Sequence, residues 1–266
     1  MATVKEIYTA LDAFAPFETQ AGFDNAGFLV GRGECEVTRV LVALDITDAV
    51  IEEAIQLGAQ LIVAHHPLVF EPIRSVTDES LIGKKLLRLA ETGIAAICAH
   101  TNLDACEGGV NELLAQTLGL SDIQQLCCEG EDRFGRPYGI GRVGTIRTKN
   151  IVKAKDFAET VKKALDAAGV RYVDAGKPVC RVAVGGGSCG SMLADAVAAG
   201  CDTFVTADVK YNVFLDAAQL GINLMDAGHF ATEDVITQPL VDLLAEKFPG
   251  LTVQKSAVHH EVYSCV

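Results

Sequence analysis

The stretch Arg39–His66 reads RVLVALDITDAVIEEAIQLGAQLIVAHH and decides the fold class of this chain. It holds two short apolar runs, 40–44 and 61–64, separated by a helical segment that Thr47 or Asp48 can cap and Gly58 can end. The apolar runs are continuous, as in parallel strands that helices cover on both faces. The pattern therefore predicts a strand–helix–strand unit within an α/β fold, with mostly parallel or mixed sheets flanked by helices.

The same pattern occurs a second time. Arg39–His66 aligns without a gap on Arg181–Asp208, and six aligned positions are identical, including a glycine before the second strand. The next strand segment, Gly93–His100, likewise resembles Gly221–Gly228. We therefore expect two related α/β lobes.

The polar patch 128–133, with glycines on either side, is the expected boundary between the lobes. This boundary gives a first lobe of residues 1–127 and a second of residues 128–266. Ligands of open α/β sheets gather at the carboxyl ends of strands, so the expected site is a cleft between the two lobes.

Composition excludes several classes of protein. The chain has 266 residues, 50% hydrophobic and 21% charged, which supports a large core and excludes global disorder. A formal charge of −13 argues against nucleic-acid partners, DNA clamping included, and against anionic membranes. The nine cysteines form no Cys-x-x-Cys pair, and no secretory signal or membrane-length apolar run is present. We therefore expect reduced thiols and a cytoplasmic protein.

Two histidines, His65 and His66, directly follow the strand 61–64, and Pro67 then stops the strand. Successive side chains of a strand point to opposite faces, so these imidazoles do not easily share one ion unless the backbone turns. A pair of metal ions is the economical use of both. The alternative is one core histidine and one solvated histidine.

A second polar cluster, His100–Asp104, follows the apolar strand 94–98. Asp104 supplies a hard oxygen ligand that can bridge two cations, while His100 and Asn102 can orient it. The alternative is that Asp104 simply forms a turn with Asn102.

The third cluster contains His229 and Glu233, which lie four residues apart and so on one face of a helix. Capping of that helix is the alternative role for Thr232 and Glu233. Together with His65, His66 and Asp104, the clusters provide three imidazoles and two carboxylates. This is the composition of a dinuclear hydrolytic site that holds Zn, Mn, Fe or Co.

Three other segments leave alternatives open. The polar residues of Phe23–Gly27 can line the site or form an Asx turn. The amides of Gly185–Gly190 can cradle a phosphate, or the glycines can serve a tight turn. Cys189 lies at a helix start but has no partner for thiol catalysis. We expect no metal at His259-His260-Glu261.

Taken together, the clusters resemble the Nif-three-like dinuclear metal family, whose members are often labelled homologues of type two GTP cyclohydrolase I. The matching segments keep the family's order over most of the chain. They are Phe23–Gly27, Ala64–Pro67, Ala99–Asp104, Val184–Ser188, Thr206–Tyr211 and Ala227–Glu233.

The resemblance implies that His65, His66, Asp104, His229 and Glu233 bind two divalent ions per subunit, with Asp104 and Glu233 as bridging carboxylates. It also implies a two-lobed α/β fold with the metals between the lobes, and a ring-shaped homohexamer.

The sequence departs from the family pattern at three positions outside the ligand set, and it lacks the inserted domain of longer relatives. Phe23 stands where the family usually has Trp, Ala207 where it has Gly, and Asn212 where a His commonly follows Tyr211. These departures affect the surroundings of the site and the substrate contacts rather than metal binding.

The ligand set favours a metal-dependent hydrolase with a small-molecule substrate. GTP-cyclohydrolase-like ring opening and cleavage of a nucleotide or phosphoester both fit, with His100 or Asp208 as the proton shuttle. The alternative is a metal-holding ring that binds a partner without turnover. Structural zinc sites are usually closed and rich in cysteine, which favours the enzyme.

Overall fold

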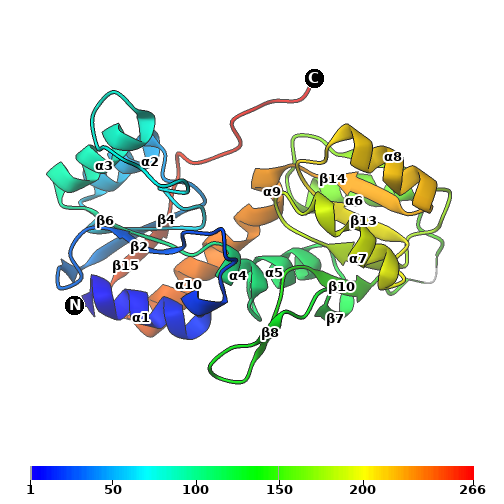
Figure 1. Ribbon diagram of the computed structural model, residues 1–266, viewed down its shortest axis with the longest axis horizontal. Coiled ribbons are helices and arrows are strands. Elements are labelled where there is room, and N and C mark those ends of the chain that lie inside the picture. The colour runs from blue at the N-terminus through cyan, green and yellow to red at the C-terminus, as the bar shows by residue number, and fades with distance from the viewer. Residues whose placement is uncertain (1, 149) are drawn as a thin grey trace. The chain divides into compact units, whose positions relative to one another are not determined.

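The structure is a computed structural model that describes residues 2–148 and 150–266. These residues form two compact units. The first unit contains the chain up to Leu103 together with Ile236–His260, and the second contains Asp104–Val235 and Glu261–Val266. Each unit has a sheet flanked by helices (Figure 1), which confirms the predicted α/β class with two lobes.

The sheet of the first unit has a parallel centre. Its strands follow the order β15 (Thr252–Lys255), β4 (Arg39–Ala43), β5 (Leu61–Ala64), β6 (Ala95–Cys98) and β2 (Gly27–Val30). All of these neighbours are parallel except β2, which pairs antiparallel with β6. A small separate pair joins β1 (Ala2–Thr3) to β3 (Glu36–Val37).

Helices cover both faces of this sheet (Figure 1). α2 (Asp48–Leu57) and α3 (Leu81–Thr92) pack on one face, where Leu41, Ile62 and Ala96 are fully buried with them. α1 (Val4–Phe14) and α10 (Thr237–Lys247) lie on the other face. Burial on both faces explains why the strands read as continuous apolar runs. η1 (Phe17–Thr19) is a short helix of this unit, and α4 (Thr101–Ala105) begins at the end of its first segment. η3 (Asp234–Ile236) ends where the chain returns to this unit.

The second unit repeats this plan. Its sheet follows the order β11 (Arg171–Val173), β14 (Asn223–Asp226), β13 (Thr203–Thr206), β12 (Arg181–Val184), β10 (Arg142–Thr145) and β7 (Ser121–Gln125). Strands β12, β13 and β14 are parallel, and the outer strands are antiparallel.

Two helix pairs cover this second sheet, and a short hairpin extends from it. α5 (Val110–Thr117) and α6 (Ala154–Ala164) pack on one face. α7 (Leu193–Ala198) and α8 (Tyr211–Leu220) pack on the other. The remaining elements are the hairpin β8 (Gly130–Glu131) with β9 (Pro137–Tyr138), and the short helices η2 (Gly190–Met192) and α9 (His229–Glu233).

Strand register confirms the internal repeat. β4 pairs with β5 in the register Val40–Leu61, and β12 pairs with β13 in the register Val182–Thr203. These are the pairs that the sequence alignment superposes. The internal repeat is therefore present in the strand pairing as well as in the amino-acid sequence.

The predicted ends of α2 are also confirmed. Thr47 Oγ1 accepts a hydrogen bond from the backbone N–H of Val50 at 3.2 Å, so Thr47 rather than Asp48 is the cap. Gly58 ends the helix in the left-handed conformation, with φ of 66°. Gly200 adopts the same conformation in the second unit, with φ of 73°.

The observed division of the chain differs from the expected boundary between residues 127 and 128. β7 belongs to the second sheet through its pairing with β10, whereas β15 returns to the first sheet and pairs with β4. Strand pairing between distant segments decides which unit a segment joins. The polar patch 128–133 instead starts the exposed β8–β9 hairpin, and Asp104 falls in the second unit.

No helix within the described residues is both long enough and apolar enough to span a membrane.

A buried arginine fixes the start of β10. Arg142 is 2% exposed, and its guanidinium donates to the carbonyl oxygens of Gly139, Gly141, Ala105 and Cys106 at 2.7–3.3 Å. These four carbonyls belong to two segments that are far apart in sequence. The arginine therefore links the chain after α4 to the central sheet of the second unit.

We predict that Arg142→Met destabilises the second unit by about 3–5 kcal/mol, because several buried carbonyls lose their donor at once. Arg147→Met is the matched control. Arg147 is exposed and, within the described residues, forms its ion pair with Asp122, so its loss should cost less than about 1 kcal/mol. Urea unfolding followed by circular dichroism measures both, and equal losses would contradict the structural role of Arg142.

Candidate metal centre

Three imidazoles gather in the first unit at the carboxyl ends of two neighbouring parallel strands. His65 and His66 follow β5, and His100 follows β6. Their ring centroids lie 4.9, 5.1 and 5.5 Å apart, and one nitrogen of each lies within 4.8 Å of the others. This separation allows the three nitrogens to share one metal ion.

The backbone turns where the two adjacent histidines occur. The N–H groups of His65 and His66 both donate to the carbonyl oxygen of Leu44, at 3.2 and 2.9 Å, because β5 has already ended at Ala64. Strand alternation therefore no longer applies to these residues, and the two rings lie together. The condition given for sharing one ion, a turn of the backbone, is therefore met, and the arrangement of these two rings is compatible with one ion or with two.

Each of the three imidazoles is held through Nδ1. This nitrogen lies 2.8 Å from the carbonyl oxygen of Ala99 in His65, from Asp45 Oδ1 in His66 and from Asp24 Oδ1 in His100. An oxygen acceptor at this distance places the proton on Nδ1, so Nε2 is the basic nitrogen of each ring. Ligating histidines in metalloproteins show this arrangement.

Asp24 shows what the Phe23–Gly27 segment does. Its carboxylate is fully buried, and it also accepts hydrogen bonds from the backbone N–H and the hydroxyl of Thr101. Burial would raise the pKa of Asp24, but the bonds from His100 and Thr101 outweigh it and lower the pKa to about 2. Asp24 is therefore an ionised group that orients His100, a role that the sequence analysis missed.

The neighbours of Asp24 fix the same loop. Asn25 Nδ2 donates to the carbonyl oxygen of Val69 at 2.6 Å. Phe23 is 69% exposed, and its ring meets the ring of Phe70 edge-on at 6.3 Å. The segment therefore joins the loop after β5 to the start of α4.

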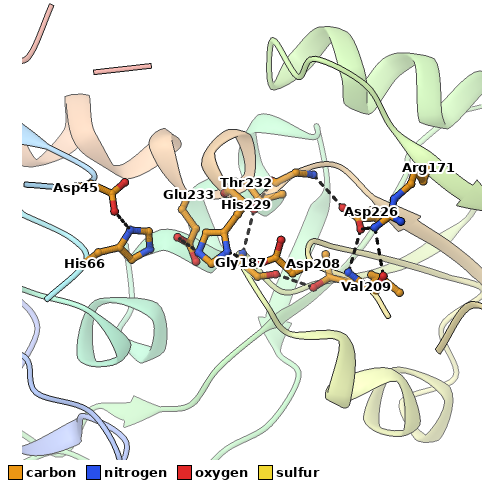
Figure 2. Close-up of polar contacts among 12 residues, drawn as sticks. Asp45, His66, Arg171, Gly187, Asp208, Val209, Asp226, His229, Thr232 and Glu233 are labelled. Atoms are coloured by element: carbon orange, nitrogen blue, oxygen red, sulfur yellow. Dashed lines mark hydrogen bonds and ion pairs between the residues drawn. The ribbon is translucent and has the colours of Figure 1, made fainter. Parts of the chain in front are cut away.

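The second unit presents an imidazole and a carboxylate on α9. His229 Nε2 lies 3.0 Å from Glu233 Oε2, one helical turn away, as the spacing predicts. His229 Nδ1 lies 2.7 Å from Asp208 Oδ2 (Figure 2). Asp208, predicted as a proton shuttle, is therefore placed to orient His229. In the internal repeat Asp208 aligns with His66.

The glycine loop after β12 packs against Glu233. A Cβ on Gly187 would lie 2.0 Å from Glu233 Oε1 and 3.1 Å from His229 Nε2. The amide of Gly187 donates to Thr232 Oγ1 at 3.0 Å (Figure 2), and the amide of Gly186 donates to Asn111 Oδ1 at 2.8 Å. These amides already have protein acceptors. The structure therefore indicates that these glycines allow the loop to pack closely against Glu233, and it does not favour a phosphate-binding role for their amides.

Asp104 and Glu233 belong to one acidic environment. Both are buried, at 8% and 3% exposure. Burial raises the pKa of the Cys189 thiol, and the charges of Asp104 and Glu233 raise it further. Cys189 is therefore a protonated thiol beside two candidate ligands, and thiol catalysis is disfavoured.

Asp45 is a further residue that the sequence analysis did not single out. Burial would raise its pKa, but hydrogen bonds from His259 and His66 hold the pKa far below its usual range. Its position two residues after the end of β4, at the carboxyl edge of the sheet, was the available signal.

Comparison with known proteins identifies the family. The sequence model of Duf34/NIF3 (NGG1p interacting factor 3) matches residues 2–262. The chain belongs to the Duf34/NIF3 family. This confirms the resemblance on which the ligand set was based.

Two proteins similar in sequence to this chain carry the name GTP cyclohydrolase 1 type 2 homolog. The protein from Clostridium perfringens is 33% identical over 231 residues, which cover 86% of each chain. The protein from Streptomyces coelicolor is 37% identical over 237 residues, covering 88% of this chain and 82% of the relative.

Solved structures share the fold of this family member. A Staphylococcus aureus hypothetical protein superposes with a TM-score of 0.92 at 30% identity, and 99% of each chain is covered. A Bacillus cereus protein related to NIF3 superposes with a TM-score of 0.91 at 26% identity, again over 99% of both chains.

We predict that Gly187→Ala lowers divalent-ion binding, because the added Cβ displaces the Glu233 carboxylate. Gly200→Ala is the matched control, since Gly200 also has positive φ but has no atom within 4 Å of an added Cβ. Both variants should lose about 1–2 kcal/mol of stability from backbone strain. Ion binding, measured by elemental analysis after dialysis, should fall only in Gly187→Ala; an equal fall in both would contradict the steric explanation.

The buried Asp24 carboxylate should make stability depend on pH. Its pKa is about 2 in the folded chain against an ordinary 3.8, so its contribution is complete above about pH 4 and lost as pH falls through about 2. We expect Asp24→Asn to remove about 2 kcal/mol at neutral pH, with the difference from wild type shrinking as pH falls from 4 to 2. Urea unfolding across this range measures it, with the exposed Asp78→Asn as control. A constant difference would exclude this titration.

Proposed function

We propose that this chain is a metal-dependent hydrolase that acts on a small-molecule substrate, either a nucleotide or another phosphoester. The proposed ligands are His65, His66, Asp104, His229 and Glu233. They would bind two divalent ions per subunit, with Asp104 and Glu233 as the bridging carboxylates.

One observation carries the proposal: the imidazoles of His65, His66 and His229 are each held at Nδ1 by an oxygen acceptor at 2.7–2.8 Å. An acceptor that orients the imidazole through its second nitrogen is a regular feature of histidines that bind metals. The donor set also fits the ions. Imidazole nitrogens with carboxylate oxygens suit Zn, Mn, Fe and Co, and neither unit offers a thiolate-rich closed site among its described residues.

Bound divalent ions would supply Lewis acidity and an activated water molecule. The protein's own residues would then orient the substrate and move protons. His100 is the better of the two predicted proton shuttles, because Asp24 holds its Nδ1 and leaves Nε2 to exchange a proton. Asp208 would instead keep His229 in its coordinating orientation.

The names of the relatives support a purine nucleotide as the first substrate to test. GTP-cyclohydrolase-like ring opening and phosphoester cleavage need the same two functions, an activated water and a polarised electrophile. The assay should therefore follow both products.

The alternative function is a metal-holding ring, expected to be a homohexamer, that binds a partner without turnover. The family name, NGG1p interacting factor 3, favours an interaction role. Under this alternative the ions stabilise the assembly.

Elemental analysis of freshly purified protein tests the ligand set. We expect two ions per subunit in the wild type, and a lower content in His66→Ala and Glu233→Gln because each removes a ligand atom. Arg88→Ala, a surface change in the first unit, is the control and should keep both ions. Wild-type protein that binds no divalent ion would refute the proposal.

Turnover and assembly separate the two functions. Metal-loaded and chelator-treated protein are assayed against a nucleotide panel, and His229→Ala is examined in parallel by light scattering. Loss of metal-dependent turnover with an unchanged mass supports the hydrolase. A wild type without turnover, together with a His229→Ala variant that dissociates, supports the ring.

A further inference from the structure

The segment after β15 is attached to the first unit by a compact set of hydrogen bonds. Ser256 donates its hydroxyl to Glu53 Oε2 on α2, and Ala257 donates its N–H to Glu53 Oε1 at 2.9 Å. Ser256 Oγ in turn accepts from the N–H of His259 at 3.2 Å. The backbone of His259 is therefore fixed in place by the same unit that carries β4 and β5.

This attachment places the His259 side chain against Asp45. The imidazole is only 6% exposed, and its Nε2 lies 3.2 Å from Asp45 Oδ2. The other oxygen of the carboxylate, Oδ1, lies 2.8 Å from His66 Nδ1 (Figure 2). Asp45 therefore bridges two imidazoles, one on each oxygen.

The bridge matters because Asp45 is not fixed by burial. Its side chain is 42% exposed, whereas Asp24, which holds His100, is 0% exposed. The terminal torsion of an aspartate is broad, so a half-exposed carboxylate can rotate unless both oxygens are engaged. For Asp24 the second oxygen is engaged by Thr101. For Asp45 it is engaged by His259.

We propose that His259 is a positioning residue: it fixes the plane of the Asp45 carboxylate, which then sets the tautomer and ring orientation of His66. The role of His66 as a ligand rests on the proposed function. His259 itself does not coordinate the ion, and its neighbour His260 takes no part.

Two substitutions at this position separate the contact from the rest of the side chain. Gln places its amide nitrogen the same number of bonds from Cα as His Nε2, so His259→Gln can keep the hydrogen bond to Asp45. Asn is one carbon shorter, so His259→Asn stays polar but cannot reach. His260→Asn makes the same change one residue away, at an exposed position, and is the matched control.

The first measurement is the tautomer of His66 in metal-free protein, read from long-range nitrogen–proton NMR correlations of the imidazole. We expect a single Nδ1-protonated form in the wild type, His259→Gln and His260→Asn. We expect a mixture of both tautomers in His259→Asn.

The second measurement is the affinity for Zn²⁺ by chelator competition. The loss of an orienting partner typically weakens metal binding 10- to 100-fold. His259 acts on His66 only through Asp45, so we expect the smaller effect, about a 10-fold loss of Zn²⁺ affinity in His259→Asn. In His259→Gln and His260→Asn we expect the affinity to fall less than about threefold.

An unchanged His66 tautomer in His259→Asn overturns the proposal, as does an equal loss of affinity in all three variants. If the wild type binds no Zn²⁺, the proposed function fails while the tautomer measurement still decides the role of His259. If His259→Asn does not fold, His259→Ala, which also loses the contact to Asp45, takes its place: a mixture of His66 tautomers supports the proposal, and a single tautomer overturns it.

Discussion

The candidate metal centre depends on one repeated interaction, the hydrogen bond from an imidazole Nδ1 to a fixed oxygen acceptor. His65, His66, His100 and His229 all make it, with one backbone carbonyl and three carboxylates as acceptors. This contact sets which nitrogen carries the proton and how the ring is turned. Without it, four histidines at strand ends would be titratable side chains with several orientations rather than a set of preoriented donors.

The internal repeat explains why such residues occur in both units. The strand, helix, glycine, strand sequence brings parallel strands to a common edge, and each strand delivers its next residues to that edge. In the first unit these residues are His65, His66 and His100; in the second they are Asp208, His229 and Glu233. The repeat thus supplies a scaffold twice, and substitution at equivalent strand ends gives one unit imidazoles and the other mainly carboxylates.

Hydrogen bonding decided questions that composition left open. From the sequence alone, the glycines after β12 suit a phosphate-binding loop and a close packing contact equally well. In the structure, the amides of two of them donate to Asn111 and Thr232. Glu233 occupies the space that a side chain at Gly187 would need. Likewise, the polar patch 128–133 has the composition of a domain boundary, yet it begins a hairpin. The polarity of a segment indicates only that it is exposed to solvent. The unit to which a segment belongs depends on the strands with which it forms hydrogen bonds.

The sequence alone determined the α/β class, the repeat with its strand register, the helix ends at Thr47 and Gly58, and the spacing of His229 and Glu233 on one helix face. All of these follow from local periodicity, capping and conformational preference, which act over a few residues. Only the tertiary structure decided that the backbone turns at His65 and His66 so that the rings lie together, and that Asp24, Asp45 and Asp208 stand behind the imidazoles. It also decided that His259 reaches Asp45 from more than 200 positions away. Contacts of this kind depend on the three-dimensional path of the chain, which no local pattern encodes.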